Sequence, residues 1–310
     1  MKLFYSDHFP LPLPDGHRFP MSKYTLLRER ILASDIAPHC FLQTPDAASD
    51  TQLSLVHQKE YVDRVIHGKL TDLEIKRIGF PWSDKMVERS RRSTGASICA
   101  AKAAITDGVS GNLAGGTHHA FSDSGQGYCV FNDVCVAAKT MQYEGAVENV
   151  LIVDCDVHQG NGSSAIAHSD PSLFSFSMHC DKNYPFKKTD GDLDIALPVG
   201  ADDEMYLLEL QHGLNGILER FTPNLVFYLA GADPFVDDRL GKLNLTKEGL
   251  AKRDRLVFDF FVRQRIPIAF CMAGGYAPDV ADIVDIHFNT VQVALEAFQA
   301  ISSITSKPIF

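Results

Sequence analysis

VLIVDCDVHQGNG, residues 150–162, joins a wholly apolar run to a segment rich in Asp, His and Gly. Consecutive apolar residues, as in Val150–Val153, are typical of a strand buried on both faces of a parallel sheet. In an extended strand side chains alternate, so Asp154, Asp156 and His158 would share one face. Two carboxylates and an imidazole suit Zn²⁺ or another divalent cation. The alternative is an ordinary strand end and turn, because Asp and Gly are common turn residues.

Three further segments place polar residues after apolar or helical runs, and they favour the metal site. Gly115-Gly116-Thr117-His118-His119-Ala120 sets adjacent histidines between small residues that permit close approach of a ligand. Asp233 follows the apolar strand expected at Leu225–Leu229, and Gly274-Gly275-Tyr276 follows the one expected at Ile266–Cys271. In an open parallel sheet, ligands bind in the crevice at the carboxyl ends of the strands. The four segments together predict one metal-containing site there.

Strand and helix patterns alternate along the chain. The expected strands are Lys2–Tyr5, Val150–Val153, Ser172–Met178, Ile195–Leu197, Leu225–Leu229 and Ile266–Cys271. The expected helices are Tyr24–Ala33, His57–His67, Trp82–Ile105, Phe131–Tyr143, Glu204–Phe221 and Thr246–Arg263. This alternation predicts an α/β fold with a parallel sheet flanked by helices on both faces. Because no linker or composition break divides the chain, residues 1–310 are expected to form a single domain.

Composition narrows the class of protein. The net charge of -10 argues against a nucleic-acid surface and leaves room for a lysine-bearing substrate to approach an acidic rim. No apolar run is long enough to span a bilayer, and Met1–Asp7 lacks the hydrophobic core of a signal peptide, so a cytoplasmic location is expected. The seven cysteines form no Cys-x-x-Cys pair, which predicts buried, reduced thiols. Alternation would turn Cys155 away from the metal.

The motifs, taken together, resemble the histone deacetylase superfamily, which has the arginase/deacetylase fold. The matching segments run from His57 to Tyr276 and include residues 115–120, 127–133, 154–162, 231–233 and 274–276. Within the superfamily, Asp238-Arg239-Leu240-Gly241 and Lys252-Arg253-Asp254 most resemble the class IV deacetylases. The resemblance implies a zinc-dependent hydrolase that removes acetyl or longer acyl groups from Nε-acyl-lysine.

The resemblance assigns Asp156, His158 and Asp233 as ligands of one Zn²⁺ per chain, with Fe²⁺ or Co²⁺ as alternative ions. Three ligands leave a position open for water and for the substrate carbonyl, as catalytic zinc sites require. Zinc would lower the pKa of bound water to about 7, and this water would attack the amide. Asp154 and Ser177 match positions that help to hold a K⁺ or Na⁺ ion beneath the zinc.

The same resemblance assigns His119 as the general base for the water and as the acid for the departing amine. His118, oriented by Asp154, would be its electrostatic partner, because an adjacent carboxylate favours imidazolium. His119 would meet Asn161, where many relatives have an aspartate, and should therefore stay neutral near pH 7. Tyr276 would donate its hydroxyl to the oxyanion that forms after attack.

Substrate contacts are also implied. Gly127 matches the glycine whose carbonyl accepts the substrate amide N–H, and Tyr128 would form one wall of the acyl-lysine tunnel. Tyr184-Pro185-Phe186 lies in the loop of the other wall with a different spacing, and core packing is an equal alternative for its phenylalanine. His17 and Arg18 lie where relatives line an internal acetate-release cavity, and a surface basic pair is the alternative.

Three kinds of function stay open from the sequence. A deacylase acting on acyl-lysine in a protein or peptide is favoured by the complete set of catalytic residues. An amidohydrolase of acetylpolyamines or other small acylated amines is the alternative. A corepressor-type binding protein would not need both His119 and Tyr276, and an arginase-like site would need more carboxylates for a second metal.

Overall fold

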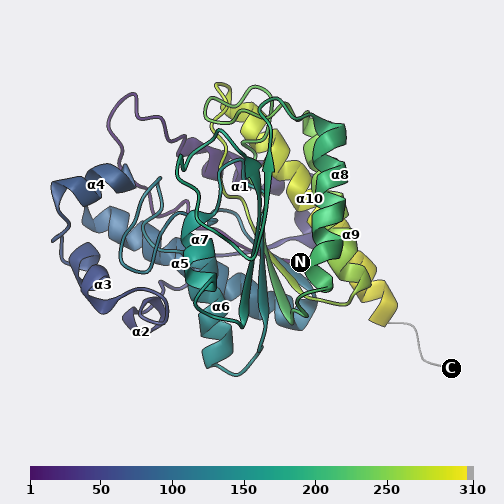
Figure 1. Ribbon diagram of the computed structural model, residues 1–310, viewed down its shortest axis with the longest axis horizontal. Coiled ribbons are helices and arrows are strands. Elements are labelled where there is room, and N and C mark those ends of the chain that lie inside the picture. The colour runs from purple at the N-terminus through teal and green to yellow at the C-terminus, as the bar shows by residue number, and fades with distance from the viewer. Residues whose placement is uncertain (306–310) are drawn as a thin grey trace.

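In the computed structural model, which describes residues 1–305, the chain forms an eight-stranded sheet in which every strand pair is parallel (Figure 1). The strands are β1 Lys2–Phe4, β2 Phe41–Gln43, β3 Val109–Asn112, β4 Val150–Asp154, β5 Leu173–Cys180, β6 Leu193–Leu197, β7 Leu225–Leu229 and β8 Ile268–Cys271. Their order in the sheet is β2-β1-β3-β8-β7-β4-β5-β6. The predicted parallel α/β fold is confirmed.

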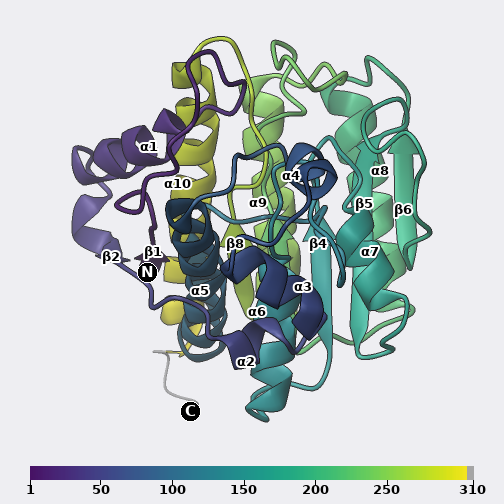
Figure 2. The ribbon, with the colours of Figure 1, turned by 90° about the vertical axis from the view of Figure 1, so that its left-hand side faces the viewer.

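Helices cover both faces of this sheet. They are α1 Ser22–Leu32, α2 Asp50–Leu53, α3 Lys59–Ile66, α4 Asp72–Ile78, α5 Asp84–Asp107, α6 Asp133–Tyr143, α7 Asn161–Ala167, α8 Asp203–Leu218, α9 Lys247–Arg263 and α10 Val280–Thr305. Figure 2 looks onto the face covered by α3, α5, α6 and α7, with α8 and α9 behind the sheet. Helices α1, α8, α9 and α10 supply the core of the opposite face.

The central strands are apolar throughout because both of their faces are buried. In β4, Val150 and Ile152 belong to the core that includes α5 and α6, whereas Leu151 and Val153 belong to the core that includes α8 and α9. Complete burial of such a side chain contributes about 1.5–3 kcal/mol. Because each face of β4 packs into its own hydrophobic core, every residue of the run is apolar.

The register of the strands brings four loops together. Strands β3, β8, β7 and β4 are neighbours, and their last residues pair across the sheet, with Asn112 opposite Cys271, Cys271 opposite Leu229, and Leu229 opposite Asp154. In parallel strands the carboxyl ends lie on the same edge, so the loops that follow these four strands meet there. The residues that indicated a metal site from sequence lie in these loops or, for Asp154, at the last position of β4.

Several elements differ from the sequence prediction. Strand β4 ends at Asp154, so Asp156 and His158 converge through the loop backbone and not through strand alternation. Strand β3 was missed because its sequence, Val-Ser-Gly-Asn, has no apolar run, and β2 was missed because it is a short, largely exposed edge strand. Helices α2, α4, α7 and α10 were also not predicted.

The structure also shows the state of the cysteines and the character of the helices. In the part of the chain that the structure describes, all seven cysteines are unpaired, and every one except Cys99 is buried. Cys155 lies in the core beside α8 and α9, and it is not among the clustered metal-binding groups. No helix within residues 1–305 has the combined length and apolarity needed to cross a membrane.

A buried arginine fastens helix α9 to the strand ends. Arg253 is fully buried, and its Nη1 donates to the carbonyl oxygens of Gly231 at 2.6 Å and of Cys155 at 3.3 Å. Its Nε donates to Asp254 Oδ1 at 2.9 Å, and Tyr228 Oη donates to the same oxygen at 2.5 Å. Arg253 thus joins the backbones of two loops that carry the predicted ligands.

We expect Arg253→Met to lower the free energy of unfolding by about 3–5 kcal/mol, because it leaves the buried Asp254 carboxylate without a counter-ion and two carbonyl oxygens without their donor. Arg255→Met is the matched control, since Arg255 lies on the same helix and pairs with Glu296 at the surface, where each side chain is more than half exposed. Its loss should cost less than about 1 kcal/mol. Denaturant titration measures both, and equal losses would contradict the role of Arg253.

Candidate metal centre and active site

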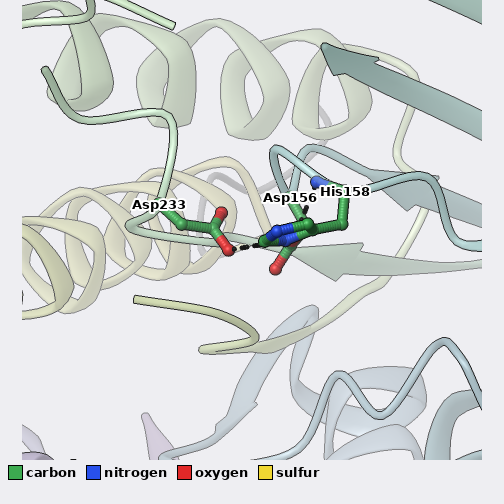
Figure 3. A group of neighbouring side chains, drawn as sticks. All are labelled: Asp156, His158 and Asp233. Carbon is green, nitrogen blue, oxygen red and sulfur yellow. Dashed lines mark hydrogen bonds and ion pairs between the residues drawn. The ribbon is translucent and has the colours of Figure 1, made fainter. Parts of the chain in front are cut away.

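Three side chains converge where the loops after β4 and β7 meet. Figure 3 shows Asp156 and His158, from the loop between β4 and α7, pointing toward Asp233 from the loop after β7. Each offers a nitrogen or oxygen atom, these atoms lie within 4.8 Å of one another, and all three residues are buried. The structure thus brings together the three residues that sequence predicted as metal ligands.

Hydrogen bonds hold the two carboxylates in orientation. Asp156 Oδ2 accepts the Gly274 N–H at 2.8 Å, and Asp156 Oδ1 lies 2.9 Å from His158 Nδ1. Asp233 Oδ1 accepts the Val157 N–H at 2.9 Å. Each carboxylate is therefore bonded to the backbone of a neighbouring loop, which keeps the cluster in place as the loops pack.

One carboxylate oxygen of the cluster, Asp233 Oδ2, lacks a hydrogen-bond partner. Asp233 Oδ2 is buried and accepts no hydrogen bond of suitable geometry, although it lies 3.2 Å from His158 Nδ1. Burial and the negative charge of Asp156 raise the pKa of the Asp233 carboxyl to about 7. A cation would satisfy this oxygen and relieve the repulsion between the carboxylates. The donor set of two carboxylates and one imidazole therefore fits a divalent ion.

The adjacent histidines have different partners and different protonation. His118 Nδ1 lies 2.6 Å from Asp154 Oδ2; burial opposes its charge, but Asp154 and Asp156 outweigh burial and raise the pKa to about 9. His119 Nδ1 donates to Asn161 Oδ1 at 2.7 Å, which leaves Nε2 as an acceptor. Burial and the nearby charge of His118 hold the pKa of His119 well below its ordinary value. His118 is therefore charged and His119 neutral at pH 7.

Tyr276 reaches the cluster from the loop after β8. Its ring lies nearly perpendicular to that of His158, with centroids 6.4 Å apart. Its backbone N–H donates to Asp238 Oδ2 at 2.6 Å, a contact for which sequence had indicated no role. Burial and the charge of Asp156 raise the pKa of the phenol well above its usual range, so the hydroxyl keeps its proton. Tyr276 can therefore act as a hydrogen-bond donor.

Sequence reasoning missed a buried lysine beneath Tyr276. Lys23 Nζ donates to the carbonyl oxygens of Ala273 at 3.2 Å and Gly275 at 3.4 Å, and it lies 5.4 Å from the Tyr276 ring centroid. Burial lowers the pKa of Lys23 to about 8, although nearby aspartates oppose the shift. A signal was present, because Lys23 shares a helix face with the buried Leu27 at a spacing of four residues.

A pocket of about 400 Å³ leads from the surface to His119, His158 and Tyr276. Tyr128 lines it, and Tyr184 lies opposite His119 with perpendicular rings 4.9 Å apart. Phe186 also lines the pocket and is 88% exposed, so it does not pack in the core. The pocket has the aromatic walls expected of a tunnel for an extended aliphatic chain.

Gly127 is placed where no side chain fits. Its φ is +56°, and an added Cβ would lie 2.7 Å from Cδ2 of His119. The Gly127 N–H donates to the Arg77 carbonyl at 3.0 Å, and the Tyr128 N–H donates to the Ile78 carbonyl at 2.7 Å. These two bonds fasten the end of α4 beside the pocket.

The structure places two other pairs of predicted residues. Asp154 and Ser177 lie opposite each other in the β4–β5 register, and Ser177 Oγ accepts the Gly160 N–H at 3.3 Å. His17 and Arg18 line neither of two small cavities, of about 60 and 40 Å³, that lie beside the site. His17 instead lies 2.9 Å from the Gly79 carbonyl, and Arg18 is exposed. Of the two alternatives that sequence left open, the exposed Arg18 fits the surface basic pair, and a role of the two residues in an internal cavity stays a prediction.

The pocket mouth is positively charged, whereas the net charge of the chain had suggested an acidic rim. The charged residues that line the pocket, apart from its histidines, are Lys76, Arg77, Lys182 and Lys242, and no Asp or Glu of the described chain lines it. The net charge of -10 therefore resides elsewhere on the molecule. An acidic rim, which the net charge had indicated, is not found.

The domain model of the histone deacetylase family matches residues 17–291. An uncharacterized protein of Picosynechococcus sp. is 42% identical over 283 residues, which cover 91% of this chain and 94% of that protein. Histone deacetylase 2 of Arabidopsis thaliana is 28% identical over 278 residues, covering 86% and 72% of the two chains. A crystal structure of a histone deacetylase homologue from Aquifex aeolicus has the same fold, with a TM-score of 0.80 at 22% identity over 94% of this chain and 83% of that chain. This chain therefore belongs to the histone deacetylase family of hydrolases.

Proposed function

We propose that the protein is a zinc-dependent deacylase that hydrolyses the amide of Nε-acyl-lysine. Family membership supports a deacetylase, and one observation carries the finer proposal. A buried Asp156, His158 and Asp233 cluster lies at the base of a pocket of about 400 Å³, next to a neutral His119 and a protonated Tyr276. The candidates for proton acceptor, oxyanion donor and cation site thus lie close together, which supports amide hydrolysis.

Asp156, His158 and Asp233 would hold the ion, for which Zn²⁺ is proposed and Fe²⁺ or Co²⁺ are alternatives. When bound, a divalent ion supplies Lewis-acid polarisation of the amide carbonyl and a water of lowered pKa. Asp154 and Ser177, opposite each other on β4 and β5, are proposed to help to hold a K⁺ or Na⁺ ion.

His119 is the proposed proton carrier. Its Nδ1–H is bonded to Asn161, so Nε2 is the atom that accepts a proton from the attacking water and returns it to the departing amine. Asn161 fixes the ring orientation without adding negative charge, which keeps the histidine neutral. His118, charged through its contact with Asp154, stabilises negative charge that develops during attack.

Tyr276 is proposed to donate its hydroxyl to the oxyanion. Lys23 and Asp238 bind the backbone of its loop from two sides, so the ring is positioned before substrate arrives. The carbonyl of Gly127 would accept the substrate amide N–H. Tyr128 and Tyr184 would enclose the aliphatic part of the acyl-lysine side chain.

A turnover panel tests the function directly. Purified, zinc-loaded protein is expected to hydrolyse acetyl-lysine or longer acyl-lysine peptides faster than acetylpolyamines, with steady-state kcat/KM as the measurement. Turnover of acetylpolyamines alone would replace the proposal with the small-amine alternative. No turnover on any amide would overturn the catalytic assignment.

Asp233→Ala should remove most of the bound metal and nearly all activity, because it deletes one of three ligands. The fold should persist, since the cores of the sheet do not include this carboxylate. Elemental analysis after gel filtration measures the metal, and circular dichroism checks the fold. Asp237→Ala, an exposed acid four residues along, is the control and should keep one metal per chain. Full occupancy in the Asp233 variant would remove that residue from the ligand set.

His119→Ala should retain zinc and lose about 100- to 10,000-fold in turnover, because the proton must pass through this ring. His118→Ala should lose less, since His118 acts through its charge. Exposed His168→Ala should leave turnover unchanged. Steady-state kinetics with matched metal content compare the three, and near-normal turnover of His119→Ala would contradict the assignment.

Tyr276→Phe should lower turnover by about 100- to 1,000-fold while KM changes little, since only the oxyanion donor is lost. A hydroxamate inhibitor should still bind, because it chelates the metal directly. Tyr143→Phe, at a tyrosine that is 74% exposed, controls for the substitution itself. Kinetics and inhibitor titration are measured on the same preparations; unaltered turnover of Tyr276→Phe would require a different oxyanion donor.

A further inference from the structure

Basic side chains surround the mouth of the active-site pocket. Lys76 and Arg77 come from the last turn of α4, Lys182 follows β5, and Lys242 lies in the loop after β7. All four are exposed, and all four line the same pocket. Three separate segments of an acidic chain thus present cations at one opening, and no acidic residue of the described chain joins them in the pocket lining.

These cations are only partly neutralised by neighbours. Lys182 pairs with Asp181 at 2.7 Å, at a position where the lysine side chain is 71% exposed. Lys242 Nζ donates to the carbonyl oxygen of Lys182 at 2.9 Å, which draws these two lysines together without cancelling charge. Within the described residues, Lys76 and Arg77 lie within ion-pair distance of no carboxylate. The mouth therefore keeps an excess of positive charge.

Backbone contacts set the position of α4 relative to the substrate path. The carbonyl of Arg77 accepts the N–H of Gly127, the residue proposed to bind the substrate amide. The Arg77 backbone is thus held beside Gly127, and its exposed guanidinium has a planar fork that is suited to carboxylate oxygens. The mouth can therefore contact groups that flank the scissile acyl-lysine.

The range of the electrostatic field determines which charges a substrate senses. At physiological salt the Debye length is about 8 Å, so charges farther away are largely screened. A substrate group at the mouth is governed by the four local cations and much less by the overall charge of -10. Long-range repulsion of an acidic substrate by the whole molecule is correspondingly weak.

We propose that the pocket selects acyl-lysine within acidic sequence, with Asp or Glu beside the acylated residue. This inference rests on the proposed deacylase function and narrows its substrate class. Free amines of an acetylpolyamine are cations near pH 7, since alkylammonium groups have pKa values near about 10, and the mouth would repel them. An acidic peptide instead brings carboxylates to Lys76, Arg77 and Lys242.

The test compares acyl-lysine peptides that differ only in their flanks, which carry Asp, Gln or Lys. The Asp-flanked peptide should have a KM about fivefold to tenfold below the Gln-flanked peptide at low salt, as expected for several exposed ion pairs. The difference should shrink at about 0.5 M salt. 6-Acetamidohexanoate and its amide form a further pair of substrates, which differ only in a carboxylate. A preference within this pair would show that the mouth selects small acylated acids and not only acidic peptides.

Charge reversal at the mouth sharpens the test. Lys76→Glu/Arg77→Glu leaves two cations and two anions at the mouth, so the three peptides should have similar KM values. Lys252→Gln/Arg255→Gln removes two exposed cations on α9, away from the pocket, and should keep the wild-type preference. Circular dichroism and metal content confirm that each variant is folded.

The possible outcomes distinguish failure of the acidic-sequence preference from failure of the deacylase function. Turnover of all peptides with equal KM, or with the Lys-flanked peptide preferred by wild type, overturns the selection of acidic sequence and leaves the deacylase function intact. Preference only for 6-acetamidohexanoate over its amide overturns the peptide assignment. Absence of turnover on every substrate overturns the deacylase function, and the selection with it.

Discussion

Three carboxylates, those of Asp154, Asp156 and Asp233, are buried close together at the ends of neighbouring strands, and the surrounding structure offsets their charge. Burying an unpaired carboxylate costs several kcal/mol, so each needs hydrogen bonds or a cation. Backbone N–H groups of Val157 and Gly274 bind two of them, and the His118 ring binds the third. A cation at the candidate metal site would complete the charge balance of these strand ends.

Hydrogen bonding to the buried carboxylates also requires the loops to pack closely. A Cβ at Gly274 would lie 1.9 Å from Asp233 Oδ2, so only glycine lets that loop approach the cluster. Lys23 and Asp238 then bind the backbone on either side of Tyr276, and Arg253 joins the two ligand loops from below. The proposed ligands and catalytic groups lie on loops whose backbones are hydrogen-bonded to the same cluster, an arrangement that suits preorganised catalysis.

Charge acts on two scales in this molecule. At the base of the pocket, negative charge is concentrated for a cation, and at the mouth positive charge is spread over exposed side chains that water screens. The base is built by the loops after β4 and β7, and the mouth by the end of α4 and by the loops after β5 and β7. The loop after β7 contributes to both, since it carries Asp233 at the base and Lys242 at the mouth. Closeness to class IV stays a prediction.

The sequence by itself determined the parallel α/β fold, because apolar runs such as Val150–Val153 are stable only when both faces are covered. Its motifs also identified the residues that converge on the candidate site. Only the tertiary structure decided how they meet, since the aligned ends of β3, β8, β7 and β4 depend on long-range strand pairing. Composition indicated an acidic rim, but Lys76 and Lys242 are brought together by folding, and net charge carries no information about position.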